Sequence, residues 1–167
     1  LLDAMEQPRS AKVQIHIGGL YGDREGALAR FEKTYVNLAP PIRSRLVIEN
    51  DDRLFSLRDC LELHARCGIP VVFDTFHHRC LNHGESLATA IASAARTWSA
   101  DDGPLMVDYS SQKRGGRVGA HASTLSPSHF GRTLSALNGS RCDVMLEIKD
   151  KERSALEALE LVSQRRT

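Results

Sequence analysis

The chain has 167 residues, with 22 Lys and Arg against 21 Asp and Glu, so its formal net charge is +1 at pH 7. Hydrophobic residues make up 41% of the sequence and charged residues 26%, as in an ordinary water-soluble globular domain. This balance excludes a histone-like mode of nucleic-acid binding, although a local basic loop can still hold a phosphate backbone. Because the sequence has neither a membrane-spanning apolar run nor a signal-peptide pattern, we expect a cytoplasmic protein without membrane contact.

Five short apolar segments are typical of β-strands, and amphipathic segments with helical spacing follow them. The expected strands lie around residues 13–17, 46–48, 69–73, 104–107 and 142–146. The expected helices cover residues 28–38, 57–65, 87–98, 127–137 and 151–162. Ser56 is a candidate N-cap of the second helix, Gly68 ends it, and Ser126 precedes Pro127 at the start of the fourth.

This alternation predicts an α/β fold with a parallel sheet covered by helices, because most of the strands are apolar on both faces. A complete (β/α)8 barrel needs about 250 residues, so the length fits a partial TIM barrel of about five βα units or a small doubly wound domain. Residues 1–5 read like the end of a preceding helix. We therefore expect residues 1–167 to be the C-terminal part of a single TIM-barrel domain whose N-terminal strands are missing.

The cysteines predict no covalent or zinc-bound framework. Four are present, and no two of them form a CxxC pair. A chain of this length can bury a stable core without disulfide or metal cross-links, so we expect reduced thiols rather than disulfides or a structural zinc site.

A potential metal ligand stands at the carboxyl end of each expected strand. Carboxyl ends of parallel strands converge on one face, so these side chains are expected in one crevice. Crowded carboxylates repel one another, and a divalent cation would compensate their charge. Mixed Asp, Glu and His ligation suits Mn²⁺, Zn²⁺ or Fe²⁺, and two such ions can promote phosphodiester hydrolysis. The candidate ligands are His16, Glu49, Asp74, His77, Asp108 and Glu147, with His121 in a loop.

Several motifs together resemble the UV damage endonuclease family, a TIM-barrel group of DNA repair enzymes. They run in family order along nearly the whole chain. The matching segments are His16-Ile17-Gly18-Gly19, Tyr21-Gly22-Asp23, Leu46-Val47-Ile48-Glu49-Asn50-Asp51-Asp52, Pro70-Val71-Val72-Phe73-Asp74-Thr75-Phe76-His77-His78, Tyr109-Ser110-Ser111, Gly119-Ala120-His121 and the run from Asp143 to Glu152.

The resemblance implies a Mn²⁺-dependent endonuclease that incises double-stranded DNA 5′ of UV photoproducts by metal-activated water, without an obligate protein partner. The residues that match the family's metal ligands are His16, Glu49, Asp74, His77, His121 and Glu147. Where much of the family carries a Lys-x-His pair, this chain has Met106-Val107-Asp108. Asp108 can still bind a metal, but Met106 cannot replace a lysine.

Other residues near these motifs are candidates for catalysis or DNA binding. Glu147 and Lys149 are expected to act at the scissile phosphate, because alternation places both on one face of the last strand. Lys113, Arg114 and Arg117 can grip DNA phosphates from a flexible loop or form an ordinary solvated loop. Tyr109 can contact the substrate or pack its ring.

Two other functions remain open at this stage. A metal-dependent sugar isomerase or epimerase would place the same residue types at strand ends but needs no basic loop. A non-catalytic fragment is the second alternative, motivated by Met106, Asp108 and the missing N-terminal strands. Its open sheet would expose apolar surface that a complete barrel covers, so we would expect such a fragment to self-associate.

Overall fold

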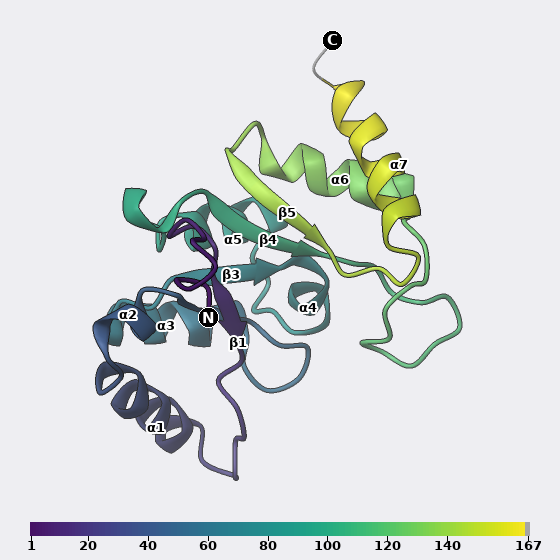
Figure 1. The fold of residues 1–167 in the computed structure, drawn as a ribbon. Coiled ribbons are helices and arrows are strands. Elements are labelled where there is room, and N and C mark those ends of the chain that lie inside the picture. The colour runs from purple at the N-terminus through teal and green to yellow at the C-terminus, as the bar shows by residue number, and fades with distance from the viewer. Residues whose placement is uncertain (166–167) are drawn as a thin grey trace.

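A computed structural model describes residues 1–165 of the chain. Its centre is one sheet of five parallel strands in the order β1-β2-β3-β4-β5 (Figure 1). A doubly wound sheet reverses its strand order at a switch point, whereas this order never reverses, as in an arc of a (β/α)8 barrel. The strands are β1 (Val13–Ile15), β2 (Leu46–Glu49), β3 (Val71–Asp74), β4 (Leu105–Tyr109) and β5 (Cys142–Leu146).

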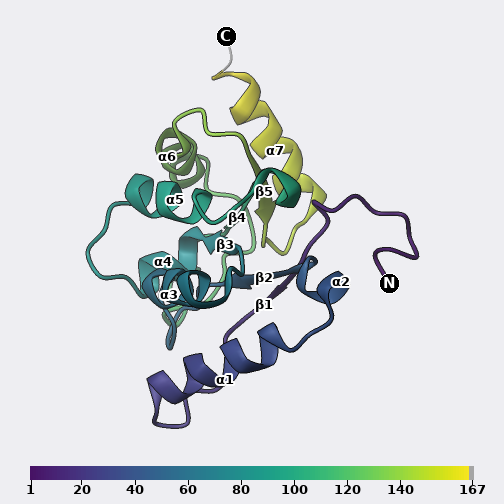
Figure 2. The same ribbon diagram turned by 90° about the vertical axis from the view of Figure 1, so that its left-hand side faces the viewer.

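The helices after the strands form a layer in chain order. Each helix of the series α1, α3, α5, α6 and α7 contacts the next, and Figure 2 shows α3, α5 and α6 on one side of the sheet. The α/β prediction of about five βα units is confirmed. The helices are α1 (Arg24–Val36), α2 (Pro40–Arg43), α3 (Leu57–Cys67), α4 (Thr75–Cys80), α5 (Leu87–Ala95), α6 (Pro127–Leu137) and α7 (Glu152–Ser163), with a 3₁₀ turn at Ala100–Asp102.

Local sequence signals explain several helix ends. Ser56 and Asp59 form a reciprocal capping box at the start of α3, and Gly68 ends that helix with a left-handed φ of 76°. The short helices α2 and α4 were not expected from the periodicity, because four and six residues are too few to show a helical repeat. Asp74 starts α4 by accepting hydrogen bonds from the backbone N–H groups of Phe76 and His77.

The strand register gives the sheet two different faces. One face carries apolar residues that pack in the core under the helices, among them Ile48, Phe73 and Val107. The opposite face carries the alternate residues, including the paired Asp74 and Asp108. Polar side chains therefore gather on one face, at the carboxyl ends of the strands.

The amino-terminal segment lies against the other edge of the sheet. Lys12 donates to the backbone carbonyl of Ser44 at 2.8 Å and pairs with Asp102 at 2.7 Å. The guanidinium of Arg45 donates to the carbonyls of Gln7 and Ala11. These contacts hold residues 7–12 at the opposite edge of the sheet from the polar strand ends.

The apolar face expected for the last helix is only partly buried. Helix α7 buries Ser154 and Ala158, whereas Leu156 and Leu159 are 64% and 62% exposed. Its periodicity was recognised correctly, but within residues 1–165 little packs over these two leucines.

No helix among the described residues is long and apolar enough to cross a membrane.

Candidate metal centre

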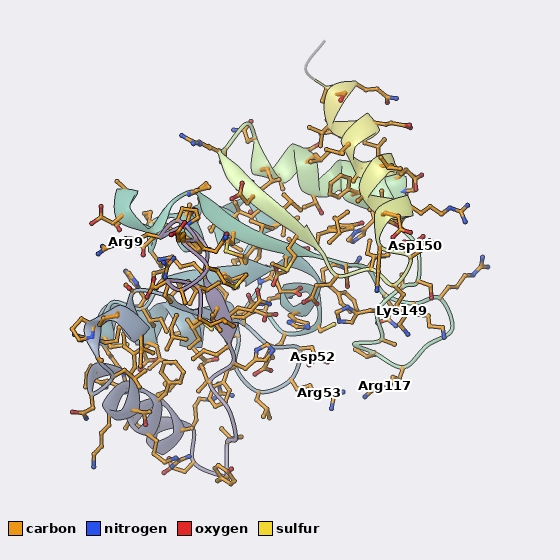
Figure 3. The ribbon with its side chains drawn as sticks, viewed as in Figure 1. Arg9, Asp52, Arg53, Arg117, Lys149 and Asp150 are labelled. Carbon is orange, nitrogen blue, oxygen red and sulfur yellow. The ribbon has the colours of Figure 1, made fainter. Side chains whose placement is uncertain are left out.

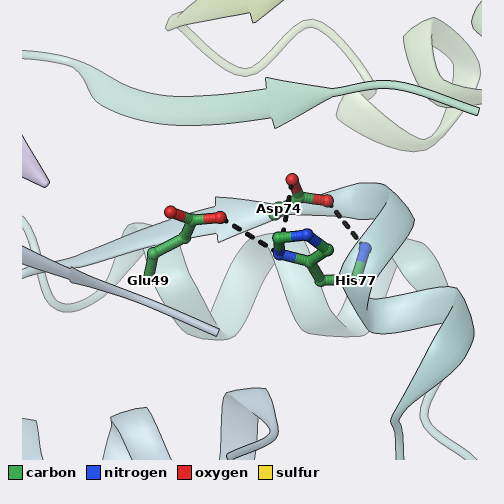
Figure 4. Close-up of side chains that lie close together, drawn as sticks. All are labelled: Glu49, Asp74 and His77. Carbon is green, nitrogen blue, oxygen red and sulfur yellow. Dashed lines mark hydrogen bonds and ion pairs between the residues drawn. The ribbon is translucent and has the colours of Figure 1, made fainter. Parts of the chain in front are cut away.

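Three side chains form the centre of the polar cluster at the carboxyl ends of β2 and β3. One ligand atom from each of Glu49, Asp74 and His77 lies within 4.8 Å of the others. Nδ1 of His77 is 3.1 Å from Oε1 of Glu49 and 3.5 Å from Oδ2 of Asp74 (Figure 4). Asp74 is fully buried, and the side chains of Glu49 and His77 are 4% and 12% exposed.

Asn50 joins the two strand ends that carry this group. Its side-chain amide donates to the carbonyl of Asp74, and its side-chain oxygen accepts from the N–H of the same residue, both at 3.0 Å. Its own backbone carbonyl lies 2.9 Å from Nδ1 of His77. Asn50 is therefore a positioning residue that fixes both the strand register and the imidazole.

Gln14 connects the cluster to β1 and β4. Its amide nitrogen donates to Oε2 of Glu49 at 3.0 Å and to Oδ2 of Asp108 at 2.9 Å. His16, two residues further along the chain and directly after β1, places Nε2 at 3.6 Å from Oε2 of Glu49. Sequence reasoning missed Gln14, although its position two residues before His16 puts both on the same face of the sheet.

The remaining predicted ligands approach from the loop after β4 and from the end of β5. Nδ1 of His121 lies 3.7 Å from Oε2 of Glu147. The His121 ring is 5.9 Å from the ring of His77 and packs edge-on against Phe76 at 5.2 Å. The structure thus links all seven predicted ligand side chains into one group.

The donor set fits a cation. Three buried carboxylate oxygens have no hydrogen-bond donor: Oε1 of Glu49, Oδ2 of Asp74 and Oδ1 of Asp108. Buried oxygens of this kind are costly unless a positive charge or a proton satisfies them. A mixture of carboxylates and imidazoles is a ligand set that Mn²⁺, Fe²⁺ or Zn²⁺ accepts.

The electrostatics of the metal-free cluster show how strongly these groups interact. Burial, together with the nearby charges of Glu49 and Asp74, raises the pKa of Asp108 to about 8 against the opposing effect of the hydrogen bond from Gln14. Burial likewise raises the pKa of Asp74 to about 6. Burial lowers the pKa of His77, but its close contact with Glu49 and the charge of Asp74 outweigh this effect and raise the pKa to about 9.

A basic loop covering residues 112–121 leads directly to His121. Its centre is filled by the side-chain amide of Gln112, which donates to the carbonyls of Lys113 at 3.1 Å and Arg117 at 2.8 Å. The amide oxygen of Gln112 accepts from the N–H of Gly119 at 3.1 Å. Sequence analysis missed this role of Gln112. The predicted DNA-binding side chains Lys113, Arg114 and Arg117 are exposed around this ordered loop.

The basic loop touches the turn after β2. A Cβ on Gly119 would lie 2.2 Å from the Asp52 carboxylate, so the two segments meet where only glycine fits. Figure 3 shows Arg53 and Arg117 projecting from these two segments. Arg53 was not expected at the site, and its Nε pairs with Oδ2 of Asp52 at 3.3 Å.

Two predicted residues lie apart from the cluster. Tyr109 is fully buried, its ring packs on Phe130, and its hydroxyl lies 3.0 Å from Nδ1 of His129, so the structure does not place it where DNA could contact it. Its neighbour Asp108 faces the cluster, and alternation turns Tyr109 to the opposite face. Lys149 is exposed in the turn after β5, at the same edge of the sheet as Arg117 (Figure 3).

The fold and the cluster define an α/β protein of the (β/α)-barrel type with a polar site at the carboxyl ends of its strands. A model of the family described as UV-endonuclease UvdE matches residues 1–166. The chain therefore belongs to the UV-endonuclease UvdE family.

Relatives and a solved structure agree with this assignment. The chain is 36% identical over 160 residues to a UV DNA damage endonuclease of Clostridium perfringens, covering 95% of this chain and 39% of the relative. It is 31% identical to one of Bacillus pumilus, covering 98% of this chain and 52% of the relative. A crystal structure of SacUVDE matches with a TM-score of 0.92 and 42% identity over 99% of this chain and 55% of that one. The chain thus spans about half the length, or less, of these relatives.

Proposed function

We propose that this chain provides the metal centre of a DNA repair endonuclease that cuts the phosphodiester bond 5′ of a UV photoproduct. The observation that carries the proposal is the group of donor-free, buried oxygens on Glu49, Asp74 and Asp108, set among histidines in a chain of this family. The curated relatives are named UV DNA damage endonucleases, which supports irradiated double-stranded DNA as the partner.

The proposed cofactor is Mn²⁺, and Glu49, Asp74, His77 and Asp108 are the residues that would hold it. When bound, a divalent ion supplies water activation and charge stabilisation for displacement at phosphorus. Each of these side chains already has a fixed position, because Asp74 caps α4 with one oxygen and Gln14 restrains both Glu49 and Asp108. Such a site requires little rearrangement to bind its ion.

The protein groups around this cluster have separate tasks in the proposal. Glu147 orients His121 and is available to accept a proton near the reacting phosphate. Lys149 and the loop side chains Lys113, Arg114 and Arg117 provide positive charge for the DNA backbone. In the proposal the carboxylates bind the metal ion, and the basic side chains around them bind the DNA backbone, so the two tasks fall to different residues.

The test is a chimera in which this chain replaces the matching residues of the Bacillus pumilus relative. Incubated with Mn²⁺ and plasmid, the chimera is expected to nick irradiated DNA and to leave unirradiated DNA intact. End-mapping on a defined lesion should place the nick 5′ of the photoproduct. Glu49→Gln should abolish nicking, whereas Glu160→Gln, an exposed substitution on α7, should not. A folded, Mn²⁺-loaded chimera that leaves irradiated DNA intact, beside an active parent relative, would refute the proposal.

A further inference from the structure

A cavity with several basic residues in its wall lies outside the metal centre, between α4 and the first turns of α6. Its volume is about 460 Å³, and its wall includes His78, Arg79, His129 and Arg132. Helix α4 directly follows β3, and α6 runs back from the long loop after β4. Both helices therefore begin at the carboxyl edge of the sheet, and the cavity lies beside the metal centre rather than at the opposite edge.

Two guanidinium groups share this cavity without a carboxylate partner. Within residues 1–165, neither Arg79 nor Arg132 forms an ion pair. Glu85 also lines the cavity, but its carboxylate accepts the backbone N–H of His83 at 2.9 Å and faces Nδ1 of His78 at 3.8 Å. Both arginines are exposed. Cations that line the same cavity still repel each other, and a bound anion would relieve this repulsion.

Two hydrogen bonds connect the exposed Arg79 through His129 to the buried Tyr109. Nη1 of Arg79 bonds to Nε2 of His129, whose Nδ1 lies 3.0 Å from the hydroxyl of the fully buried Tyr109. Because a guanidinium can only donate, Nε2 accepts, so the ring is neutral and Nδ1–H donates to the hydroxyl. Burial, and then the charges of Arg79 and Arg132, lower the pKa of His129, as this neutral form requires.

The cavity has the donors that a tetrahedral oxyanion needs. A guanidinium carries five N–H groups in a planar fork that matches phosphate oxygens, and within residues 1–165 Arg79 makes one hydrogen bond, to His129. Arg132 approaches from α6, so the two forks come from different helices. His78 lines the same wall, is 3% exposed, and its buried Nδ1 has no hydrogen-bond partner.

We propose that this cavity is a phosphate-binding site, with Arg79 and Arg132 as its charged donors and His129 as the residue that positions Arg79. Resting on the proposed function, the occupant is a backbone phosphate of the DNA duplex flanking the cut. Inorganic phosphate presents the same oxygens and serves as the probe of the cavity itself.

The first experiment titrates the chain with inorganic phosphate and follows the ¹⁵N resonances of His129 by NMR. Phosphate should shift them in a saturable manner, and Arg79→Gln with Arg132→Gln should weaken binding at least tenfold. Arg9→Gln removes one charge from the exposed amino-terminal segment and should have no effect (Figure 3). Absence of a saturable shift, or equal loss in the Arg9 variant, would overturn the site.

The positioning role of His129 has its own test. His129→Gln retains a side-chain acceptor for Arg79 and should keep phosphate affinity within about threefold, whereas His129→Leu should lose about tenfold. Phosphate affinity for these two variants is followed by calorimetry, and urea unfolding reports stability separately. Equal phosphate affinity in the two folded variants would show that the hydrogen bond to Arg79 does not position it.

The second experiment identifies the source of the phosphate. Fluorescence anisotropy measures binding of a duplex oligonucleotide to the wild type and to the Arg79→Gln/Arg132→Gln double variant over a salt series. The double variant should bind the duplex about tenfold more weakly than the Arg9 variant does. Its affinity for the duplex should also depend less on salt concentration than that of the Arg9 variant. Equal duplex affinity, with inorganic phosphate binding still lost, would overturn the DNA assignment. Neither measurement depends on nicking or on a metal ion, so failure of the proposed reaction is distinguished from failure of this site.

Discussion

Removing one carboxylate from the cluster is expected to stabilise the metal-free chain. The side chain of Asp108 is buried, and its pKa lies at about 8 in the folded chain against 3.8 as the ordinary value. Because folding favours the neutral form, its contribution to stability is fully present below about pH 4 and is lost as pH rises towards 8. At pH 7 the folded chain keeps the Asp108 proton, whereas the unfolded chain has lost it. This difference lowers the free energy of unfolding by about 4 kcal/mol, at about 1.4 kcal/mol for each pH unit above the ordinary pKa.

Asp108→Asn removes the titration and keeps the shape of the side chain. Its amide oxygen can still accept from Gln14, so the variant should be more stable than the wild type by a few kcal/mol at pH 7 without metal. Urea unfolding followed by circular dichroism, from pH 5 to 8 with a chelator present, measures the difference, which should grow with pH. Asp143→Asn, an exposed control, should change little. A metal-free Asp108→Asn chain that is less stable than wild type at pH 7 to 8 would refute the electrostatic reasoning.

Three further predictions concern residues that hold the site together. Gln14→Met removes the donor shared by two carboxylates and should lower metal-free stability by about 2 kcal/mol in urea unfolding; an unchanged midpoint would contradict it. Gln112→Ala should speed hydrogen exchange of the Gly119 amide at least about tenfold, because that amide loses its acceptor; unchanged protection would show that the loop orders itself otherwise. Gly119→Ala should weaken duplex binding more than Gly115→Ala, since both have positive φ but only Gly119 abuts Asp52; equal effects would exclude the steric contact.

The sequence was sufficient to predict the arrangement of the sheet and the membership of the cluster. Alternating strand and helix patterns require crossovers, so parallel strands and convergent carboxyl ends follow from general rules. His16 and Glu49 could thus be placed together without coordinates, although 33 positions separate them in the sequence. Asp74 is also the N-cap of α4. Sequence periodicity did not reveal this role, because α4 is too short to show a helical repeat.

Other features depend on three-dimensional contacts that sequence patterns do not encode. Tyr109 is the exception, because it directly follows a cluster residue and strict alternation along the strand could have shown that it faces the helices. Gln112 looked like any polar loop residue, because its role depends on which carbonyls the loop turns inward. Leu156 and Leu159 fit the helical period, but periodicity marks an apolar face and does not show what covers it.

The most direct test of the central claim is a Mn²⁺ titration of the purified chain followed by electron paramagnetic resonance, which separates free from bound ion. Wild type should bind Mn²⁺ saturably, and Glu49→Gln and Asp74→Asn should each weaken binding at least about tenfold. Glu160→Gln should bind like the wild type. If the wild-type chain binds no Mn²⁺, or if the two cluster variants bind it as tightly as the wild type, the side chains at the strand ends do not form a manganese centre.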